Sequence, residues 1–311
     1  MAHGAGADPV KKLVIATRRS RLALWQAEYI KRQLEEIHSL QVILNPMSTR
    51  GDELVDRRLD EAGGKGLFVK ELENAMTDGR ADLAVHSMKD VPAELPPGFI
   101  LAAITRREDP RDALVSNKYD RFAAIPAGGV IGTSSLRRAA QLAERHPQLE
   151  VRLLRGNVET RLAKLDRDEY DAIVLAVAGL ARLGLEQRIR ARLEVEASLP
   201  APGQGALGIE CLAQRTDLVE LLKPLRDAAS EICVRAERAV SRALGGSCAL
   251  PLAAYAELAG ERLRLRALVA SADGRRVARA DCVGTASEPE ALAQEAVAAL
   301  RRQGADRILA K

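Results

Sequence analysis

The chain alternates short runs of aliphatic and β-branched residues with longer segments in which apolar residues recur at helical spacing. Short apolar runs bounded by turn residues are typical of buried strands, and the longer amphipathic segments are typical of helices packed on one face. Their regular alternation predicts an α/β protein with largely parallel strand pairing. In the first part of the chain, the predicted strands are Lys12–Thr17, Val42–Met47 and Asp82–Val85, and the predicted helices are Leu22–Glu36 and Leu67–Thr77.

A second block repeats this alternation. The polar, proline-containing segment Thr105–Arg111 separates the two blocks, and a loop rich in glycine and proline covers Ser198–Gly208. Two similar blocks joined by two polar crossings predict a hinged, two-lobed clamp whose ligand lies beyond the carboxyl ends of the strands. In the second block, the predicted strands are Val130–Gly132, Val151–Leu154 and Ala172–Ala176, and the predicted helices are Leu136–Glu144 and Val158–Leu165.

The pattern changes after about residue 228. A predicted helix, Ser230–Ala243, leads into a Gly-Gly-Ser-Cys turn, and antiparallel strands are predicted around Tyr255 and over Leu263–Val269. A last helix is predicted over Glu288–Arg302. The length of 311 residues is sufficient for two or three domains.

Composition excludes several classes of protein. Aromatic residues make up only 3% of the chain and the net charge is +4, dispersed among many acids, so we expect no nucleic-acid partner. No apolar stretch is long enough to span a membrane, and the first ten residues lack the apolar core of a signal peptide, so we expect a cytoplasmic protein. The four cysteines are far apart and form no CxxC pair, which predicts neither a metal site nor a disulfide framework.

Three predicted strand-to-helix junctions combine small or hydroxyl residues with arginine. Free N–H groups at a helix N-terminus attract anions, and arginine holds a carboxylate in a bidentate pair. A single junction of this kind is usually N-cap chemistry beside a surface arginine. Together they favour a ligand with several carboxylates or phosphates. The junctions are Thr17–Ser20, Gly132–Ser135 with Arg137 and Arg138, and Arg155–Asn157 with Thr160 and Arg161.

Asp90 follows the predicted strand Asp82–Val85 and lies next to Lys89. An aspartate after a strand is commonly a turn or cap residue. In a cationic cleft it would instead be a carboxylate with a depressed pKa, able to offset positive charge on a reacting group or to pass a proton. The glycine-rich stretch Gly63–Gly66 lacks the full phosphate-loop pattern, so nucleotide binding is not expected.

Cys248 differs from the other cysteines. Cys211, Cys233 and Cys282 lie in apolar patterns and are predicted to be core residues. Cys248 follows two glycines and a serine at a sharp turn, where its thiol would either protrude into a cleft or be a buried structural residue.

The sequence closely resembles the porphobilinogen deaminase (hydroxymethylbilane synthase) family from about Leu13 to Ala310. The resemblance rests on nine stretches in the same order, which are IATRRSRLALWQA, TRGD, GGKGLFVKELE, AVHSMKDVP, REDPRDALVS, GTSSLRRAAQLAE, LRGNVETRL, AVAGLARLGL and LPAPGQGALGIE.

The resemblance implies a transferase that deaminates porphobilinogen and joins four units head to tail into hydroxymethylbilane, releasing ammonia, in haem and porphyrin biosynthesis. It implies a covalent dipyrromethane cofactor attached through a thioether to Cys248, no metal and a monomeric enzyme. Each pyrrole carries an acetate and a propionate, so the growing chain is a polyanion, which explains the arginine-rich junctions.

Residue roles carried over from the resemblance centre on Asp90, which would contact pyrrole N–H groups and stabilise the azafulvenium cation left by ammonia. Phe68 would pack against the incoming ring, and Ser87 would lie in the cleft. The implied cofactor contacts are Lys89, Thr133, Ser135, Arg137 and Arg138. The implied contacts to substrate or growing chain are Arg18, Ser20, Gln26, Lys65, Arg155, Arg161, Arg182 and Gln204.

The sequence departs from the family pattern at three places. Arg21 replaces a common proline, Glu61 replaces a common lysine, and Ser247 lengthens the usual GGC turn while Cys248 stays in register. The role of that lysine is therefore not carried over.

The resemblance implies two lobes like those of periplasmic binding proteins and a small C-terminal α/β domain. The first, discontinuous lobe would comprise residues 11–105 and 206–225, the second 111–199, and the third domain 228–311. The alternative from another class of protein is a two-lobed module that binds or senses an anion without catalysis. Such a module would need neither Cys248 nor a carboxylate in a cationic cleft.

Overall fold

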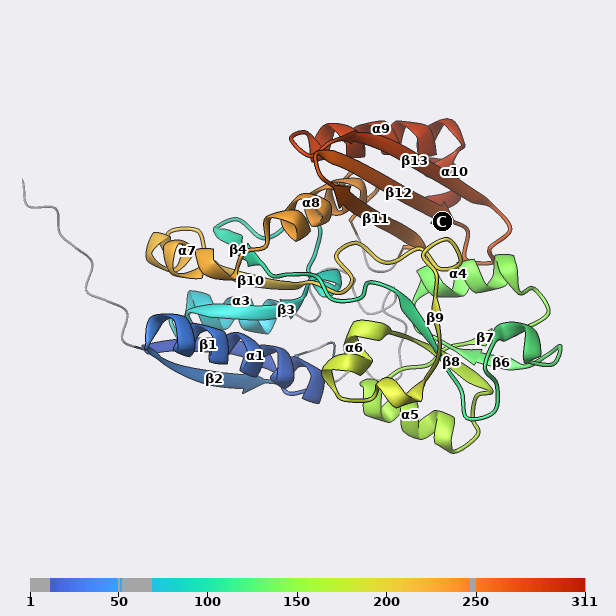
Figure 1. Ribbon diagram of the computed structural model, residues 1–311, viewed down its shortest axis with the longest axis horizontal. Coiled ribbons are helices and arrows are strands. Elements are labelled where there is room, and N and C mark those ends of the chain that lie inside the picture. Colours follow the sequence, from blue (N-terminus) through green and yellow to red (C-terminus); the bar gives the residue numbers. More distant parts are fainter. Residues whose placement is uncertain (1–11, 50, 52–68, 247–249, 311) are drawn as a thin grey trace, which may run out of the picture.

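The computed structural model describes residues 12–49, 51, 69–246 and 250–310 (Figure 1). Its helices are α1 (Arg21–His38), α3 (Lys70–Thr77), α4 (Leu136–Arg145), α5 (Val158–Asp166), α6 (Val177–Arg182), α7 (Thr216–Leu222), α8 (Ala228–Ala243), α9 (Pro289–Arg302) and α10 (Ala305–Leu309). Single 3₁₀ turns are η1 (Met88–Asp90), η2 (Phe122–Ala124), η3 (Glu186–Arg188) and η4 (Lys223–Leu225).

The strands form three sheets. The first has the order β2 (Gln41–Met47), β1 (Lys12–Arg18), β3 (Leu83–Ser87), β10 (Leu207–Leu212) and β4 (Phe99–Ile104). The second has the order β7 (Glu150–Arg152), β6 (Val130–Gly132), β8 (Ala172–Ala176), β5 (Asp112–Val115) and β9 (Ile189–Leu193). The third joins β11 (Leu252–Ala259), β12 (Arg262–Ala270) and β13 (Val277–Thr285).

The predicted α/β class, with two larger units and a smaller C-terminal one, is confirmed. The expectation of largely parallel pairing holds for only half of each large sheet. β1 pairs in parallel with β2 and β3, and β6 does so with β7 and β8, but β10 and β5 run antiparallel to their neighbours. The antiparallel strands flank the two polar crossings, where the chain passes from one sheet to the other.

Both faces of the first sheet are covered by helices. Leu13, Ile15 and Val85 pack with Ile30 and Leu34 of α1. On the opposite face, Ala16 and Ala84 pack with Leu72 and Met76 of α3. Because successive strand residues point to opposite faces, strands buried on both sides have continuous apolar sequences.

The third sheet is antiparallel, and α8 and α9 cover one of its faces (Figure 1). Their common core includes Val240 of α8, Leu263 and Leu265 of β12, and Leu300 of α9. The sequence pattern did not predict β13, where buried alanines alternate with the exposed charged residues Arg279 and Asp281.

The two crossings meet at Glu237 of α8, which is completely buried. Its carboxylate accepts hydrogen bonds from both terminal nitrogens of Arg107 on the first crossing, at 2.7 and 2.8 Å. It also accepts one from the backbone N–H of Gly203 on the second crossing, at 2.6 Å. Arg107 in turn donates to the carbonyl of Gln204 at 2.8 Å, so both crossings and the C-terminal unit are joined at one buried ion pair.

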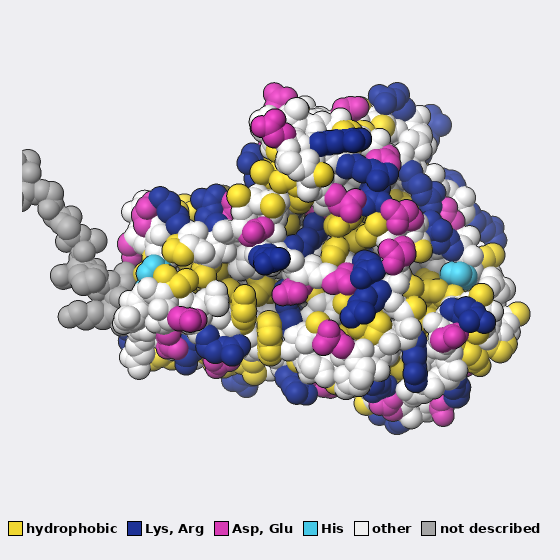
Figure 2. Space-filling view, viewed as in Figure 1, with side chains coloured by type: hydrophobic (Ala, Val, Ile, Leu, Met, Phe, Trp, Pro, Cys, Tyr) yellow, Lys and Arg dark blue, Asp and Glu magenta, His cyan; other side chains and the backbone are white. Residues whose placement is uncertain are grey.

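Among the residues that the structure describes, no helix combines the length and apolar character needed to cross a membrane. On the face shown in Figure 2, basic and acidic side chains are interspersed.

Candidate functional site

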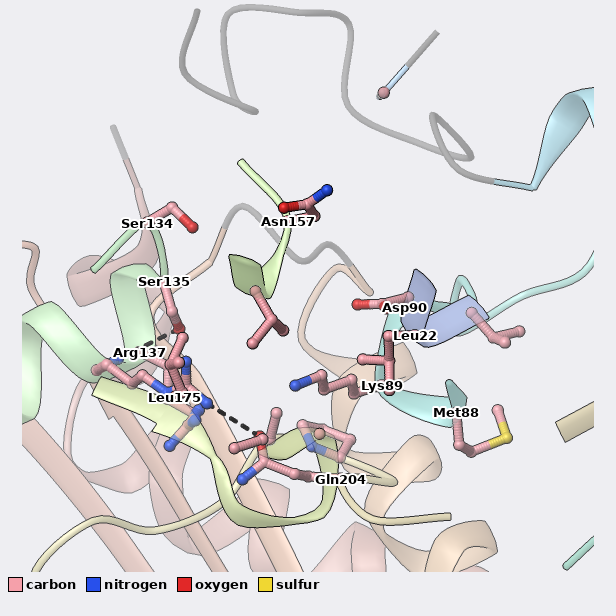
Figure 3. A pocket seen from close by; sticks show the side chains of 18 of the residues that line it. Leu22, Met88, Lys89, Asp90, Ser134, Ser135, Arg137, Asn157, Leu175 and Gln204 are labelled. Atoms are coloured by element: carbon pink, nitrogen blue, oxygen red, sulfur yellow. Dashed lines mark hydrogen bonds between the residues drawn. The ribbon is translucent and has the colours of Figure 1, made fainter. Parts of the chain in front are cut away.

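A cleft of about 370 Å³ lies where the ends of the two large sheets face each other (Figure 3). The N-terminal ends of α1, α4 and α5, the turn η1, the second crossing and the end of α8 all contribute to its wall. Asp90 is the acidic residue among the described lining residues. The basic residues that line it are Arg18, Lys89, Arg137, Arg138, Arg155, Arg161 and Arg238.

All three predicted junctions border this cleft, and each has a real N-cap. Ser20 accepts a hydrogen bond from the N–H of Ala23, Ser135 from that of Arg138, and Asn157 from that of Thr160. The N-cap explanation and the anion-binding explanation therefore apply together, because the capped helix ends point at a common cavity.

Asp90 ends η1, directly after β3, and lies across the cavity from Ser134 and Arg137 (Figure 3). Lys89 extends its side chain toward the same side as Arg137 (Figure 3). Burial lowers the pKa of Lys89 to about 8, and Arg138 lowers it too, whereas Asp90 and Asp112 act in the opposite direction. Burial and Arg138 also lower the pKa of Arg161 to about 10, again opposed by Asp90. The carboxylate of Asp90 thus stabilises two cations of the cleft.

The second crossing supports the turn that carries Asp90. The N–H of Met88 donates to the carbonyl of Ala206 at 3.0 Å, and the Met88 side chain packs against Gly203. A Cβ on Gly203 would lie 2.7 Å from Cγ of Met88, and φ there is +73°. Only glycine fits this close approach in a left-handed conformation. From the other side, Arg238 of α8 donates to the carbonyl of Pro92 at 2.8 Å.

Arg137 and Arg138 share one counter-ion that the sequence reasoning missed. The carboxylate of Asp112 lies 2.8 Å from Nη1 of Arg137 and 2.6 Å from Nη2 of Arg138. These two guanidinium groups hold the pKa of Asp112 far below its ordinary range, although burial acts in the opposite direction. The signal was present in the stretch REDPRDALVS, where an acid occupies the first position of an otherwise apolar strand.

Four residues that the resemblance implied for the cleft are close to it but are not among its lining residues: Gln26, Ser87, Thr133 and Arg182. Gln26 donates to the hydroxyl of Ser87 at 2.8 Å, and the hydroxyl of Thr133 accepts from the N–H of Ser135 at 3.2 Å. Arg182 donates to the carbonyl of Gly205 at 2.7 Å, and burial lowers its pKa to about 10. Direct ligand contacts of these residues stay predictions.

Gln204 does line the cleft and is almost fully buried. Its Nε2 donates to the carbonyl of Pro110 at 2.6 Å and to Asp112 at 3.0 Å. Arg161 donates from Nε to the carbonyl of Gly156 at 2.8 Å and from Nη2 to the hydroxyl of Ser134 at 3.2 Å. Both of these hydrogen-bond partners of Arg161 are neutral groups.

Five residues singled out in the sequence lie outside the described residues: Glu61, Lys65, Phe68, Ser247 and Cys248. The three other cysteines are buried, as predicted. Burial raises the pKa of the Cys211 and Cys233 thiols to about 11, which makes them poor nucleophiles. Within the described ranges, no group of His, Cys, Asp and Glu side chains is arranged to hold a metal ion.

Comparison with known families agrees with this geometry. The family model "Porphobilinogen deaminase, dipyromethane cofactor binding domain" matches residues 13–220, and "Porphobilinogen deaminase, C-terminal domain" matches residues 231–302. The chain belongs to the porphobilinogen deaminase family.

Two relatives called porphobilinogen deaminase show how close the similarity is. The one from Paraburkholderia phytofirmans is 60% identical over 301 residues, covering 96% of this chain and 88% of the relative. The one from Burkholderia mallei is 58% identical over 301 residues, covering 96% of this chain and 92% of the relative.

Similarity to solved structures of other proteins is lower. The methionine-binding protein MetQ has a TM-score of 0.46 at 13% identity, covering 77% of this chain and 98% of that protein. The periplasmic VFT2 domain of BvgS from Bordetella pertussis has a TM-score of 0.40 at 14% identity, covering 69% of this chain and 85% of that domain.

Family membership confirms the activity that the motifs predicted. The chain is an enzyme, a transferase that assembles hydroxymethylbilane from porphobilinogen in tetrapyrrole biosynthesis, with a dipyrromethane cofactor.

Proposed function

We propose that Asp90 is the catalytic carboxylate of this enzyme. The observation that carries this proposal is its place as the acid among the described residues of a cleft otherwise lined by basic and neutral groups. As ammonia leaves porphobilinogen, positive charge develops on the pyrrole. A carboxylate beside the pyrrole nitrogen accepts its N–H and offsets that charge in the transition state, where the interaction is most favourable.

We further propose that Lys89, Ser135, Arg137 and Arg138 hold the carboxylates of the dipyrromethane, with Thr133 supporting Ser135. The cofactor fits this wall because Nε of Arg137 is buried without a hydrogen-bond partner among the described residues, which leaves a donor for an anion. Cys248 is the proposed attachment site. The described residues before and after it in the chain, Gly246 and Leu250, both line the cleft. When bound, the cofactor supplies the primer to which pyrrole units are added.

The remaining basic side chains are proposed to bind substrate and growing chain. Arg18, Arg155 and Arg161 line the cavity, and each would pair with an acetate or propionate group in bidentate fashion. Ser20 and Gln204 add polar groups to the same wall. The other proposed contacts, from behind the wall or outside the described residues, are Gln26, Lys65 and Arg182.

The three sheets support a division into three domains, which we propose to be residues 11–105 with 206–225, residues 111–199, and residues 228–311. β10 supports the discontinuity of the first, because it pairs with β3 and β4. We also propose that the enzyme is a cytoplasmic monomer without a nucleic-acid partner. The mixed charges on the surface shown in Figure 2 support the last point.

Intact mass spectrometry tests these roles. The purified protein is expected to be heavier than its sequence by one dipyrromethane, and added porphobilinogen is expected to give stepwise adducts. Cys248→Ala is expected to have the unmodified mass. A covalent cofactor on Cys248→Ala would contradict the proposed attachment site.

Asp90→Asn is expected to keep the cofactor mass while turnover falls about a hundredfold or more. The substitution removes only the negative charge that offsets the positive charge of the pyrrole in the transition state. The exposed Asp120→Asn serves as a control that removes the same charge at the surface. Turnover of Asp90→Asn close to that of the control would contradict the proposed role.

A further inference from the structure

Asp112, the first residue of β5, is completely buried and accepts six hydrogen bonds. Arg137 donates two, at 2.8 and 3.1 Å, and Arg138 donates two, at 2.9 and 2.6 Å. The hydroxyl of Ser198 donates at 2.7 Å and Nε2 of Gln204 at 3.0 Å. One carboxylate therefore joins the N-terminal end of α4 to the second crossing.

This arrangement determines which donors of the arginine pair remain for a ligand. Arg137 donates from Nη1 to Asp112 and to the carbonyl of Leu199, and from Nη2 to Asp112. Its Nε has no hydrogen-bond partner among the described residues. Arg138 donates from Nη1 to the carbonyl of Val174 and from Nε and Nη2 to Asp112, and its Nη2 also donates to Oε1 of Gln204 at 3.5 Å. Both arginines line the cleft, whereas Asp112 does not.

The net charge of Asp112, Arg137 and Arg138 also favours an anionic ligand at this wall. Two guanidinium groups against one carboxylate leave an excess of one positive charge at the wall, which matches an anionic ligand. Stability alone does not account for such a triad, since well-packed apolar residues generally serve as well as a buried ion network. A triad beside a binding cleft is instead suited to holding charged donors in one orientation before the ligand arrives.

We propose that Asp112 is a positioning residue, which orients Arg137 and Arg138 for the pyrrole carboxylates and ties that orientation to the second crossing through Ser198 and Gln204. This inference rests on the proposed roles of Arg137 and Arg138 as cofactor ligands. It assigns to the chain segment between the lobes a direct part in the geometry of the anion site.

Asp112→Asn tests the proposal, with Glu237→Gln as the matched control. Each variant removes the charge of a completely buried carboxylate that pairs with arginine, so both are expected to lose stability, but Glu237 contacts Arg107 and not the arginine pair of α4. The two variants and the wild type are purified in parallel, and the fraction that carries the covalent cofactor is measured by intact mass. The loaded fraction is expected to fall at least about fivefold in Asp112→Asn and to stay near the wild-type value in Glu237→Gln.

A milder variant keeps the test valid if Asp112→Asn does not fold. Ser198→Ala removes one hydrogen bond to the carboxylate and leaves every charge in place. We expect the fraction of Ser198→Ala that carries the covalent cofactor to fall about threefold, because Arg137 and Arg138, whose orientation is affected, are the proposed cofactor ligands. Asp112→Glu, which restores the charge, is expected to recover part of the loading lost in Asp112→Asn.

The possible failures are distinguishable. A wild-type protein without the added mass would overturn the proposed cofactor site itself. Equal loading of Asp112→Asn and wild type, equal losses of loading in Asp112→Asn and Glu237→Gln, or wild-type loading in Ser198→Ala would each overturn the positioning role while leaving the proposed function intact.

Discussion

The two large lobes each bury a carboxylate, and the two carboxylates behave in opposite ways. Asp112 in the second lobe is surrounded by guanidinium groups that hold its pKa far below its ordinary range. In the first lobe, Glu73 of α3 is 7% exposed, and burial raises its pKa to about 7, with a further contribution from the negative charge of Glu210. Asp112 is the more deeply buried of the two and yet the stronger acid, so the neighbours and not burial decide the difference.

The partners of Glu73 explain its weak acidity. Glu210 is completely buried on β10 and accepts or donates one hydrogen bond with His86, at 2.9 Å. Glu73 and Glu210 each have a carboxylate oxygen without a hydrogen-bond partner among the described residues. His86 and Lys70 lower the pKa of Glu73, but not enough to offset burial and the second acid. The comparison teaches that two arginines keep the pKa of Asp112 low in spite of burial, whereas the mixed charges around Glu73 do not.

The largest expected effect comes from removing the anion of Asp112. Asp112→Asn is expected to lower the free energy of unfolding by about 3–5 kcal/mol, because two buried guanidinium groups lose their counter-ion. Urea denaturation measures the loss. Asp109→Asn, which breaks a partly exposed pair with Arg111 in the same crossing, is expected to cost less than about 1 kcal/mol. Equal losses in the two variants would mean that burial of the pair is unimportant.

Glu73→Gln is expected to act in the opposite direction. Below pH about 4.5 the glutamate is protonated in both folded and unfolded chains. Between pH about 4.5 and about 7 the unfolded chain releases its proton first, so stability falls as the pH rises, and the loss is complete above the folded pKa.

Glutamine removes this titration. The variant is therefore expected to be about 1–3 kcal/mol more stable than wild type at pH 8 and about equal at pH 4. Thermal or urea unfolding at both pH values measures the difference, and Glu36→Gln on the exposed side of α1 is the control. A Glu73→Gln variant that is less stable than wild type at pH 8 would contradict the assignment.

The smallest effect is expected from Glu210→Gln, which keeps a hydrogen-bonding partner for His86 but removes the negative charge near Glu73. The pKa of Glu73 is expected to move down from about 7, so the pH range over which stability falls becomes narrower. The resulting change in the free energy of unfolding is about 1 kcal/mol or less at pH 8. When Glu210→Gln is added to Glu73→Gln, the pH dependence of stability is expected to stay that of Glu73→Gln alone. A further change in that pH dependence would place the titration on another group.

The sequence pattern predicted the helices and strands with strong periodicity, including α1, α4, α5, α8 and α9. It missed β4, β5, β9, β10 and β13. β5 has only four residues, and β10 follows a loop of glycine and proline, so neither shows enough of a period to be distinguished from a loop. The antiparallel direction of these strands depends on partners far along the chain, which no local pattern contains.

The sequence likewise predicted some residues of the candidate site and missed others. Motifs predicted Asp90 and most of the basic residues that line the cleft, because side chains at strand ends meet at one edge of a sheet. Asp112, Glu237 and Arg238 were not predicted. Each acts through a partner more than twenty residues away in the sequence. An acid in an apolar strand, such as Asp112, resembles an ordinary surface residue until its partners are known.

By itself the sequence determined the α/β class from its periodicity and the anionic character of the ligand from the kinds of residues at helix starts. The nine stretches that resemble the porphobilinogen deaminase family determined the family. Only the tertiary structure decided which charges are available. It showed that Arg137 and Arg138 share an internal counter-ion, while Arg161 donates hydrogen bonds to the neutral carbonyl of Gly156 and hydroxyl of Ser134. The physical reason is that charge in a protein interior depends on burial and on neighbours in space, and two of these neighbours, Ser198 and Gln204, come from a segment more than eighty residues away.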